Sequence, residues 1–182
     1  LALVGGAREA QMSAWLKELV AREVIAERPL GKFPKEETYA FRHGIMREAA
    51  YAMLTDRDRK VGHRLAGEWL EQAGESDPMV LAEHFERGDS RTRAAHWFER
   101  AAAAAFDAND FAGVIARVQR ALACEPRGEI RGALKLLECR AHGNRGDTVA
   151  AEAIAREALR ELPKESPLWF AAARVLLIAT SA

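Results

Sequence analysis

This chain of 182 residues is 49% hydrophobic, and its 27 Lys and Arg residues balance its 27 Asp and Glu residues. The composition excludes a disordered chain, and the neutral net charge excludes a general attraction to polyanions. No apolar run is long enough to span a bilayer. Cys124 and Cys139 lack a Cys-x-x-Cys spacing, which indicates reduced thiols and a cytoplasmic location.

A helix and two short strands are predicted near the start of the chain. Apolar residues recur at helical spacing over 8–20, and residues rich in β-branched and aromatic types at 24–28 and 38–42 favour strands. The residues between the strands break regular structure: Pro29, Gly31 and Pro34. This order matches the second half of a winged helix, so residues 1–55 are predicted to be the C-terminal part of such a domain. An ordinary β-hairpin between helices is the alternative.

Beyond His43 only helices are predicted. An apolar face over 45–54 begins the series. Thr55 is expected to cap the next helix, because its side-chain oxygen can accept a hydrogen bond from an otherwise unpaired backbone N–H. Asp77-Pro78 is expected to begin another helix, since proline suits the first helical turn. Residues 56–94 are therefore predicted to form a linking helical hairpin.

The later helices repeat. Asn109-Asp110 with the following Pro126 matches Gly146-Asp147 with the following Pro163, at an offset of 163 − 126 = 37 residues. The pattern resembles the tetratricopeptide repeat, whose usual period is about 34 residues. The three additional residues are expected in the loop at 127–129.

Small residues and helix-ending prolines form the signature of these repeats. Small side chains let two antiparallel helices approach closely, and proline prevents each second helix from continuing. The structural signature residues are Ala102, Phe111, Ala121, Pro126, Ala151, Ala158 and Pro163. The predicted fold is mainly α: a winged-helix remnant with a β-hairpin, followed over 95–182 by a tetratricopeptide-like α-α superhelix. A generic helical bundle is the alternative.

The last repeat is predicted to be truncated, as if both ends of the sequence were cuts within a longer protein. Its helix, starting near Ser166, would lack the second helix of its pair. An exposed apolar stripe is therefore expected on it, which self-association would cover. The stripe residues are Trp169, Ala172, Ala173 and Leu176.

The segment from Phe41 to Tyr51 contains Arg42-His43-Gly44 and resembles the end of the winged helix in STAND-class signalling ATPases. The resemblance implies that His43, with Arg42, senses ADP or ATP held by an ATPase core, which this sequence does not contain. Imidazole suits that role because it can donate a hydrogen bond to a phosphate oxygen. The family also implies a bacterial regulator, with a parent protein fused to a kinase or cyclase. The alternative is that His43 is a structural cap at the strand-to-helix junction.

Catalytic and metal-binding motifs are not found. There is no phosphate-binding loop with its Lys, no nucleophile elbow and no His-Glu-x-x-His, and the five His residues are widely spaced. No catalytic residue, metal or cofactor is predicted for this segment. Over residues 1–55, eight Lys or Arg residues face seven Glu residues. Because phosphate neutralisation dominates DNA affinity, DNA binding is disfavoured.

The predicted function is therefore non-catalytic regulation and protein interaction within a multidomain STAND-type ATPase. The helical repeats are expected to bind a protein or peptide partner, or an inducer, and neither a membrane nor a nucleic acid is an expected partner. The first alternative is a stand-alone tetratricopeptide adaptor, and the second is a winged-helix DNA-binding regulator.

Overall fold

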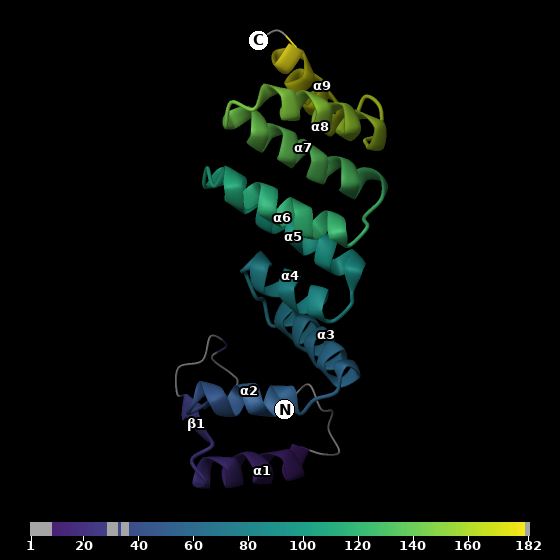
Figure 1. The fold of residues 1–182 in the computed structure, drawn as a ribbon. Coiled ribbons are helices and arrows are strands. Elements are labelled where there is room, and N and C mark those ends of the chain that lie inside the picture. The colour runs from purple at the N-terminus through teal and green to yellow at the C-terminus, as the bar shows by residue number, and fades with distance from the viewer. Residues whose placement is uncertain (1–8, 29–32, 34–36, 181–182) are drawn as a thin grey trace. The chain divides into compact units, whose positions relative to one another are not determined.

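The computed structural model describes residues 9–28, 33 and 37–180. In this part the chain is mainly helical, with one two-stranded antiparallel sheet (Figure 1). In chain order the elements are α1 (Glu9–Ala21), β1 (Ile25–Arg28), β2 (Thr38–Phe41), α2 (Gly44–Ala52), α3 (Asp56–Gln72), α4 (Pro78–Arg87), α5 (Arg91–Asp107), α6 (Phe111–Ala123), α7 (Gly128–Asn144), α8 (Thr148–Glu161) and α9 (Pro167–Thr180).

The chain divides into two compact units, Leu1–Gly74 and Glu75–Ala182. The division falls inside segment 56–94, which the sequence predicts as one linking hairpin. Helix α3 therefore belongs to the first unit and α4 to the second. Each unit is described below by itself.

The first unit contains the predicted helix and hairpin. β1 pairs with β2 in an antiparallel register in which Ile25 faces Phe41 and Arg28 faces Thr38. Glu23, with a φ of 57°, turns the chain out of α1, and the Val24 N–H donates to the Leu19 carbonyl at 3.0 Å. The turn residues predicted between the strands, Pro29, Gly31 and Pro34, lie outside the described residues.

The N-cap of α3, which follows α2 in this unit, was predicted from the sequence. The Thr55 hydroxyl accepts a hydrogen bond from the Asp58 N–H at 3.2 Å, which confirms Thr55 as the cap of α3. The Arg59 guanidinium donates to the last carbonyls of α2, those of Tyr51 and Ala52, at 3.2 and 3.1 Å. A cation in this position also suits the negative end of the helix dipole.

The predicted apolar side of α2 forms no core. None of its residues is buried, and Ile45 is 76% exposed, while Met53 just after the helix is 86% exposed. The apolar pattern over 45–54 therefore predicted the helix correctly, and the apolar side of this helix is exposed in the structure.

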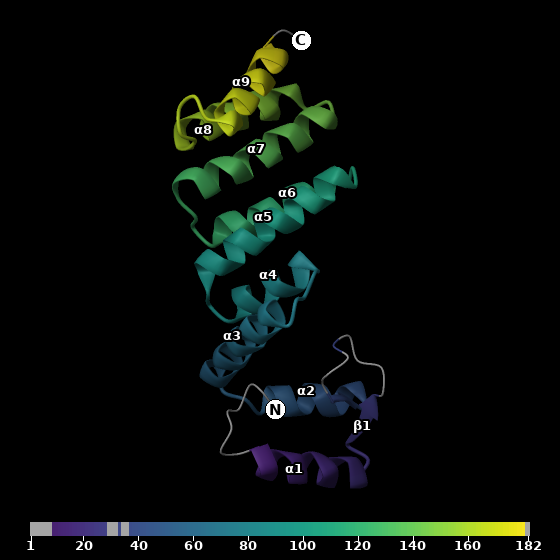
Figure 2. The ribbon, with the colours of Figure 1, turned by 180° about the vertical axis from the view of Figure 1, so that it is seen from behind.

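The second unit is a stack of consecutive helices from α4 to α9 (Figures 1 and 2). Each helix packs on the next, and α5 also contacts α7, as α7 contacts α9. Asp77 caps α4 through a 2.9 Å hydrogen bond from the Met79 N–H, and Pro78 is its first residue, as predicted. Alanine dominates the contacts: Ala102, Ala121 and Ala158 are fully buried. Small side chains let these helix backbones approach closely.

The turns α5–α6 and α7–α8 have the same construction, 37 residues apart. Asn109 and Gly146 both have positive φ, at 59° and 81°. The residue after each is an N-cap: the Asp110 carboxylate accepts from the Gly113 N–H at 2.8 Å, and Asp147 accepts from the Ala150 N–H at 3.1 Å. The offset seen in the sequence is therefore also a structural repeat.

Acid is expected to weaken the second unit through these two caps. Backbone hydrogen bonds from Gly113 and Ala150 hold the pKa of Asp110 and Asp147 below the usual aspartate value of 3.8. A depressed pKa contributes stability that is present above the ordinary value and is lost as the pH falls through the lowered one. Replacing both with Asn keeps the cap and removes the titration. Urea unfolding from about pH 6 to about pH 2 should then show a smaller acid loss in D110N/D147N than in the parent.

Two other sequence expectations are wrong. Gly128 and Glu129 are the first residues of α7, so the loop predicted at 127–129 ends at Arg127, the N-cap position. The stripe expected to be exposed on α9 faces the protein instead: Ala172 is fully buried, and Trp169 and Leu176 pack beside it. Ala173 is half-buried. The large apolar side chains that α9 does expose are Leu168, Phe170, Leu177 and Ile178.

The inward side of α9 is explained by its neighbours. Ala172 lies in a cluster with α7 and α8, whose buried members are Leu136, Cys139, Ala155, Ala158 and Leu162. The pair α7–α8 thus provides the apolar surface that a second helix after α9 was expected to supply. Burial also raises the pKa of the Cys139 thiol to about 12, which makes it an unreactive core residue.

Candidate functional site

His43 lies at the junction between the hairpin and α2. It occupies the N-cap position with extended backbone, and its carbonyl accepts from the Met46 N–H at 3.1 Å. Its side chain makes no capping hydrogen bond and is exposed. The alternative in which the imidazole caps the helix is therefore not what the structure contains, and the ring is accessible to another molecule.

Arg42 precedes it and has a local partner. Its guanidinium lies 3.5 Å from the Glu23 carboxylate, with both side chains exposed, and its backbone N–H donates to the Val24 carbonyl at 3.1 Å. These contacts tie Arg42 to the turn after α1. An exposed pair of this kind contributes little to stability, so the guanidinium can exchange Glu23 for another anion at small cost.

The alanines predicted as repeat-signature residues are buried. Ala102, Ala121 and Ala158 are fully buried and Ala151 is 1% exposed. Phe111 places its ring 5.6 Å from that of Phe106, edge to face. The prolines that end the second helices, Pro126 half-buried and Pro163 exposed, both lie in loops.

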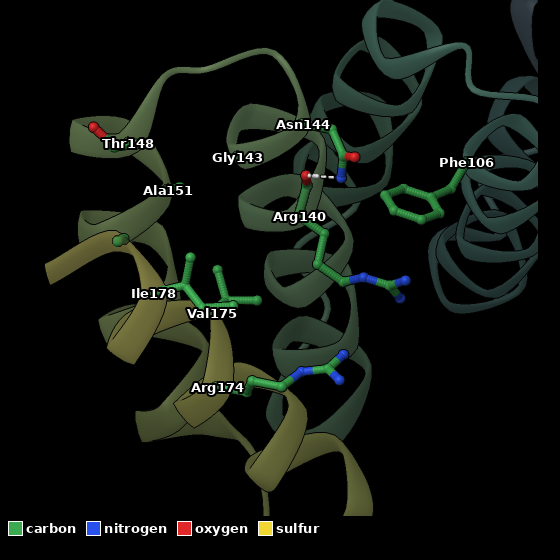
Figure 3. A pocket seen from close by; sticks show the side chains of 10 residues that line it. Phe106, Arg140, Gly143, Asn144, Thr148, Ala151, Arg174, Val175 and Ile178 are labelled. Atoms are coloured by element: carbon green, nitrogen blue, oxygen red, sulfur yellow. Dashed lines mark hydrogen bonds between the residues drawn. The ribbon is translucent and has the colours of Figure 1, made fainter. Parts of the chain in front are cut away.

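A groove crosses the second unit where α5, α7, α8 and α9 come together (Figure 3). Its volume is about 480 Å³, which falls in the range of about 300–1,000 Å³ common for ligand pockets. Phe106 of α5 forms one end. We call this hollow the groove. Its other lining residues are Arg140, Gly143 and Asn144 of α7, Thr148 and Ala151 of α8, and Arg174, Val175, Ile178 and Ala179 of α9.

The groove combines apolar walls with positive charge. Val175 and Ile178 line it beside Ala151, and every charged side chain among its lining residues is an arginine. The Arg140 guanidinium lies 4.2 Å from the centre of the Phe106 ring, a cation–π contact. The Asn144 amide donates to the Arg140 carbonyl at 2.8 Å, the dashed line in Figure 3. These contacts hold the walls in place.

No predicted site residue other than Ala151 belongs to the groove. Arg140 and Arg174 are separated by 174 − 140 = 34 residues, whereas the repeated turns are 37 residues apart, so the sequence repeat does not relate the two arginines.

In the part of the chain that the structure describes, the groove is lined by few kinds of chemical group. It contains no acid–base pair and no nucleophile beside a base, only cations, an amide, a hydroxyl and apolar walls. Across residues 9–28, 33 and 37–180, no group of three metal-ligating side chains gathers, and no helix has the length and apolar character needed to cross a membrane.

Comparison with known proteins assigns no family. No protein-family model, curated protein or solved structure matches this chain. The groove and the exposed His43 therefore carry the functional interpretation by themselves.

Proposed function

We propose that this chain is a non-catalytic regulatory and protein-interaction segment of a STAND-type signalling ATPase. The helical repeats of the second unit bind a protein or peptide partner, and the first unit, a winged-helix remnant, responds to nucleotide held by an ATPase core elsewhere in the parent protein. The observation that carries the proposal is the groove, an apolar and positively charged hollow crossed by successive repeats.

The repeat architecture supports the binding role. Stacked hairpins bury a continuous core between neighbours and leave one face for recognition. The turns at Asn109-Asp110 and Gly146-Asp147 and the buried alanines fit a degenerate tetratricopeptide-like superhelix. The groove includes an aromatic ring and two arginines, residue types that are enriched where proteins bind one another.

The first unit supports the switching role. His43 exposes its imidazole at the start of α2, where backbone N–H groups and the helix dipole favour an anion. The neighbouring apolar side of α2, including Ile45, is exposed and can contact another domain. Partner binding to the repeats would then shift the population between closed and open forms of the whole protein.

A stand-alone tetratricopeptide adaptor is the second candidate. It is favoured by one observation: every lining residue of the groove belongs to the second unit, so the groove needs nothing from His43. A DNA-binding role has less support, because eight basic and seven acidic residues nearly cancel over residues 1–55.

Nucleotide retention tests the proposal. In the longer parent protein, His43→Ala should release bound ADP at least about tenfold faster, because a donor to phosphate is removed. His96→Ala is the matched control, since His96 is also exposed but lies on α5. Equal ADP retention in all three proteins would remove the sensor role and favour the adaptor.

A further inference from the structure

We propose that the groove recognises an acidic peptide segment in which an Asp or Glu carboxylate lies between Arg140 and Arg174 and a neighbouring apolar side chain contacts Val175 and Ile178. This inference rests on the proposed protein-binding function and specifies the chemistry of the partner.

The proposal is based first on the two arginines that line the groove, Arg140 and Arg174. Some arginines of the second unit lie beside acids: Arg120 lies 2.5 Å from Glu86, and Arg131 lies 3.2 Å from Glu161. Within the described chain, neither Arg140 nor Arg174 has a carboxylate within ion-pair distance. Both line one groove, from neighbouring helices that are themselves in contact. Two guanidinium groups without acidic neighbours create a local positive field on a chain whose net charge is zero.

Guanidinium geometry favours a carboxylate. Each group presents a planar fork of N–H donors that matches the two oxygens of a carboxylate. Figure 3 shows the Arg140 side chain extended toward Phe106 and Arg174 extended from α9. The contact with the Phe106 ring holds the Arg140 head at 4.2 Å from its centre, which reduces the conformational freedom that binding would have to remove.

The apolar walls of the groove favour an apolar residue next to the acidic residue of the bound peptide. Ala151, Val175 and Ile178 offer methyl groups rather than hydrogen-bonding partners. Ile178 is 64% exposed, so covering it removes apolar surface from water. The groove volume, about 480 Å³, accommodates more than a single carboxylate. A peptide with adjacent acidic and apolar residues satisfies both kinds of surface.

A peptide fits better than a nucleic acid. Nucleic-acid affinity depends on many phosphate contacts, whereas the groove offers two cations on an otherwise neutral chain. Lining residues run from Phe106 on α5 to Ile178 on α9, so an extended segment can pass across the helices. For this reason we assign the carboxylate to a side chain within the segment and not to a chain terminus.

Random-peptide selection on the full chain tests the proposal. One phage library displays peptides with no free carboxyl terminus, and a second displays them with a free one. Both are selected on the parent chain and on R140Q/R174Q, which keeps most of each side chain's length and removes both charges. The matched control is Arg160→Gln, an exposed arginine of α8 outside the groove. Circular dichroism confirms that each variant keeps its helices.

We expect the first library to be enriched in Asp or Glu next to an apolar residue on the parent and on R160Q, but not on R140Q/R174Q. Fluorescence polarisation with the most enriched peptide should show at least about tenfold weaker binding to the double variant, and weaker binding to the parent as salt is raised.

Other outcomes separate the two proposals. Enriched peptides without acids, peptides that bind R140Q/R174Q equally, or enrichment only in the free-terminus library would overturn the acidic-segment assignment and leave the binding function standing. Enrichment of no peptide at all would contradict the peptide-binding function itself, and the assignment with it. Preferential binding of a labelled oligonucleotide over the peptides would replace the peptide with a nucleic acid.

Discussion

Phe98→Ala is expected to lower the free energy of unfolding of the second unit by about 3–5 kcal/mol, the usual cost of deleting a buried aromatic ring. Phe98 lies on α5 and is fully buried. Removing the ring leaves a cavity, and it also removes the surface under the Arg120 guanidinium, which lies 4.6 Å from the ring centre. Urea denaturation followed by circular dichroism measures the effect.

Phe170→Ala is the matched control. The Phe170 ring is on α9 and 56% exposed, so its removal should change the free energy of unfolding by at most about 1 kcal/mol, despite its edge contact with Trp169. Similar losses in the two variants would show that α5 is not at the centre of the core. A small loss for Phe98→Ala would lead to the same conclusion.

Helix caps and helix starts could be predicted from this sequence because the groups that interact there are close together in the chain. A capping oxygen and the backbone N–H that donates to it lie within a few residues of each other, so the cap at Thr55 could be predicted from sequence, as could the start of a helix at Asp77-Pro78. The small residues of α5 are buried together with two aromatic rings. The buried residues of this helix are Ala94, Ala95, Trp97, Phe98, Ala101, Ala102 and Ala105.

The buried face of a helix could not be predicted where it depends on helices that are distant in the sequence. Helix α7 lies between α5 and α6 on one side and α8 and α9 on the other, so it buries more than one face. Its buried residues therefore include Gly132 and Leu136 as well as Ala133 and Leu134, and they do not form a single apolar stripe. The same cause reversed the expectation for α9, whose apolar face packs on α7 and α8. On α2 the pattern predicted a helix but could not show what, if anything, covers it.

The groove was missed for a related reason. Its lining comes from four helices, and no two of its charged residues are near in sequence. Arginine on a helix most often indicates a solvated face, so neither Arg140 nor Arg174 stood out individually. The repeat does not relate them either, because its offset is 37 residues and the two arginines are 34 residues apart.

Gly132→Ala on α7 is expected to destabilise the second unit, although alanine is the better helix former. A Cβ at this position would lie 2.6 Å from Cγ of Leu162 and 3.1 Å from the Leu162 backbone nitrogen. Leu162 is only 4% exposed and so has little room to move. Overpacking of this kind costs about 1–3 kcal/mol, which outweighs the gain of about 1 kcal/mol in helix propensity. Chemical denaturation measures the balance.

Gly143→Ala provides the opposite expectation on the same helix. A Cβ there meets only the Ala151 Cβ at 3.9 Å, an ordinary contact, so helix propensity should dominate and the free energy of unfolding should rise by up to about 1 kcal/mol.

The double variant Gly132→Ala/Leu162→Ala tests the clash itself. Its loss in free energy of unfolding should be smaller than the sum of the two single losses, because Leu162→Ala removes the side chain that clashes. Strict additivity would place the strain elsewhere, and a stabilised Gly132→Ala would show that α7 and the segment after α8 are not in close contact.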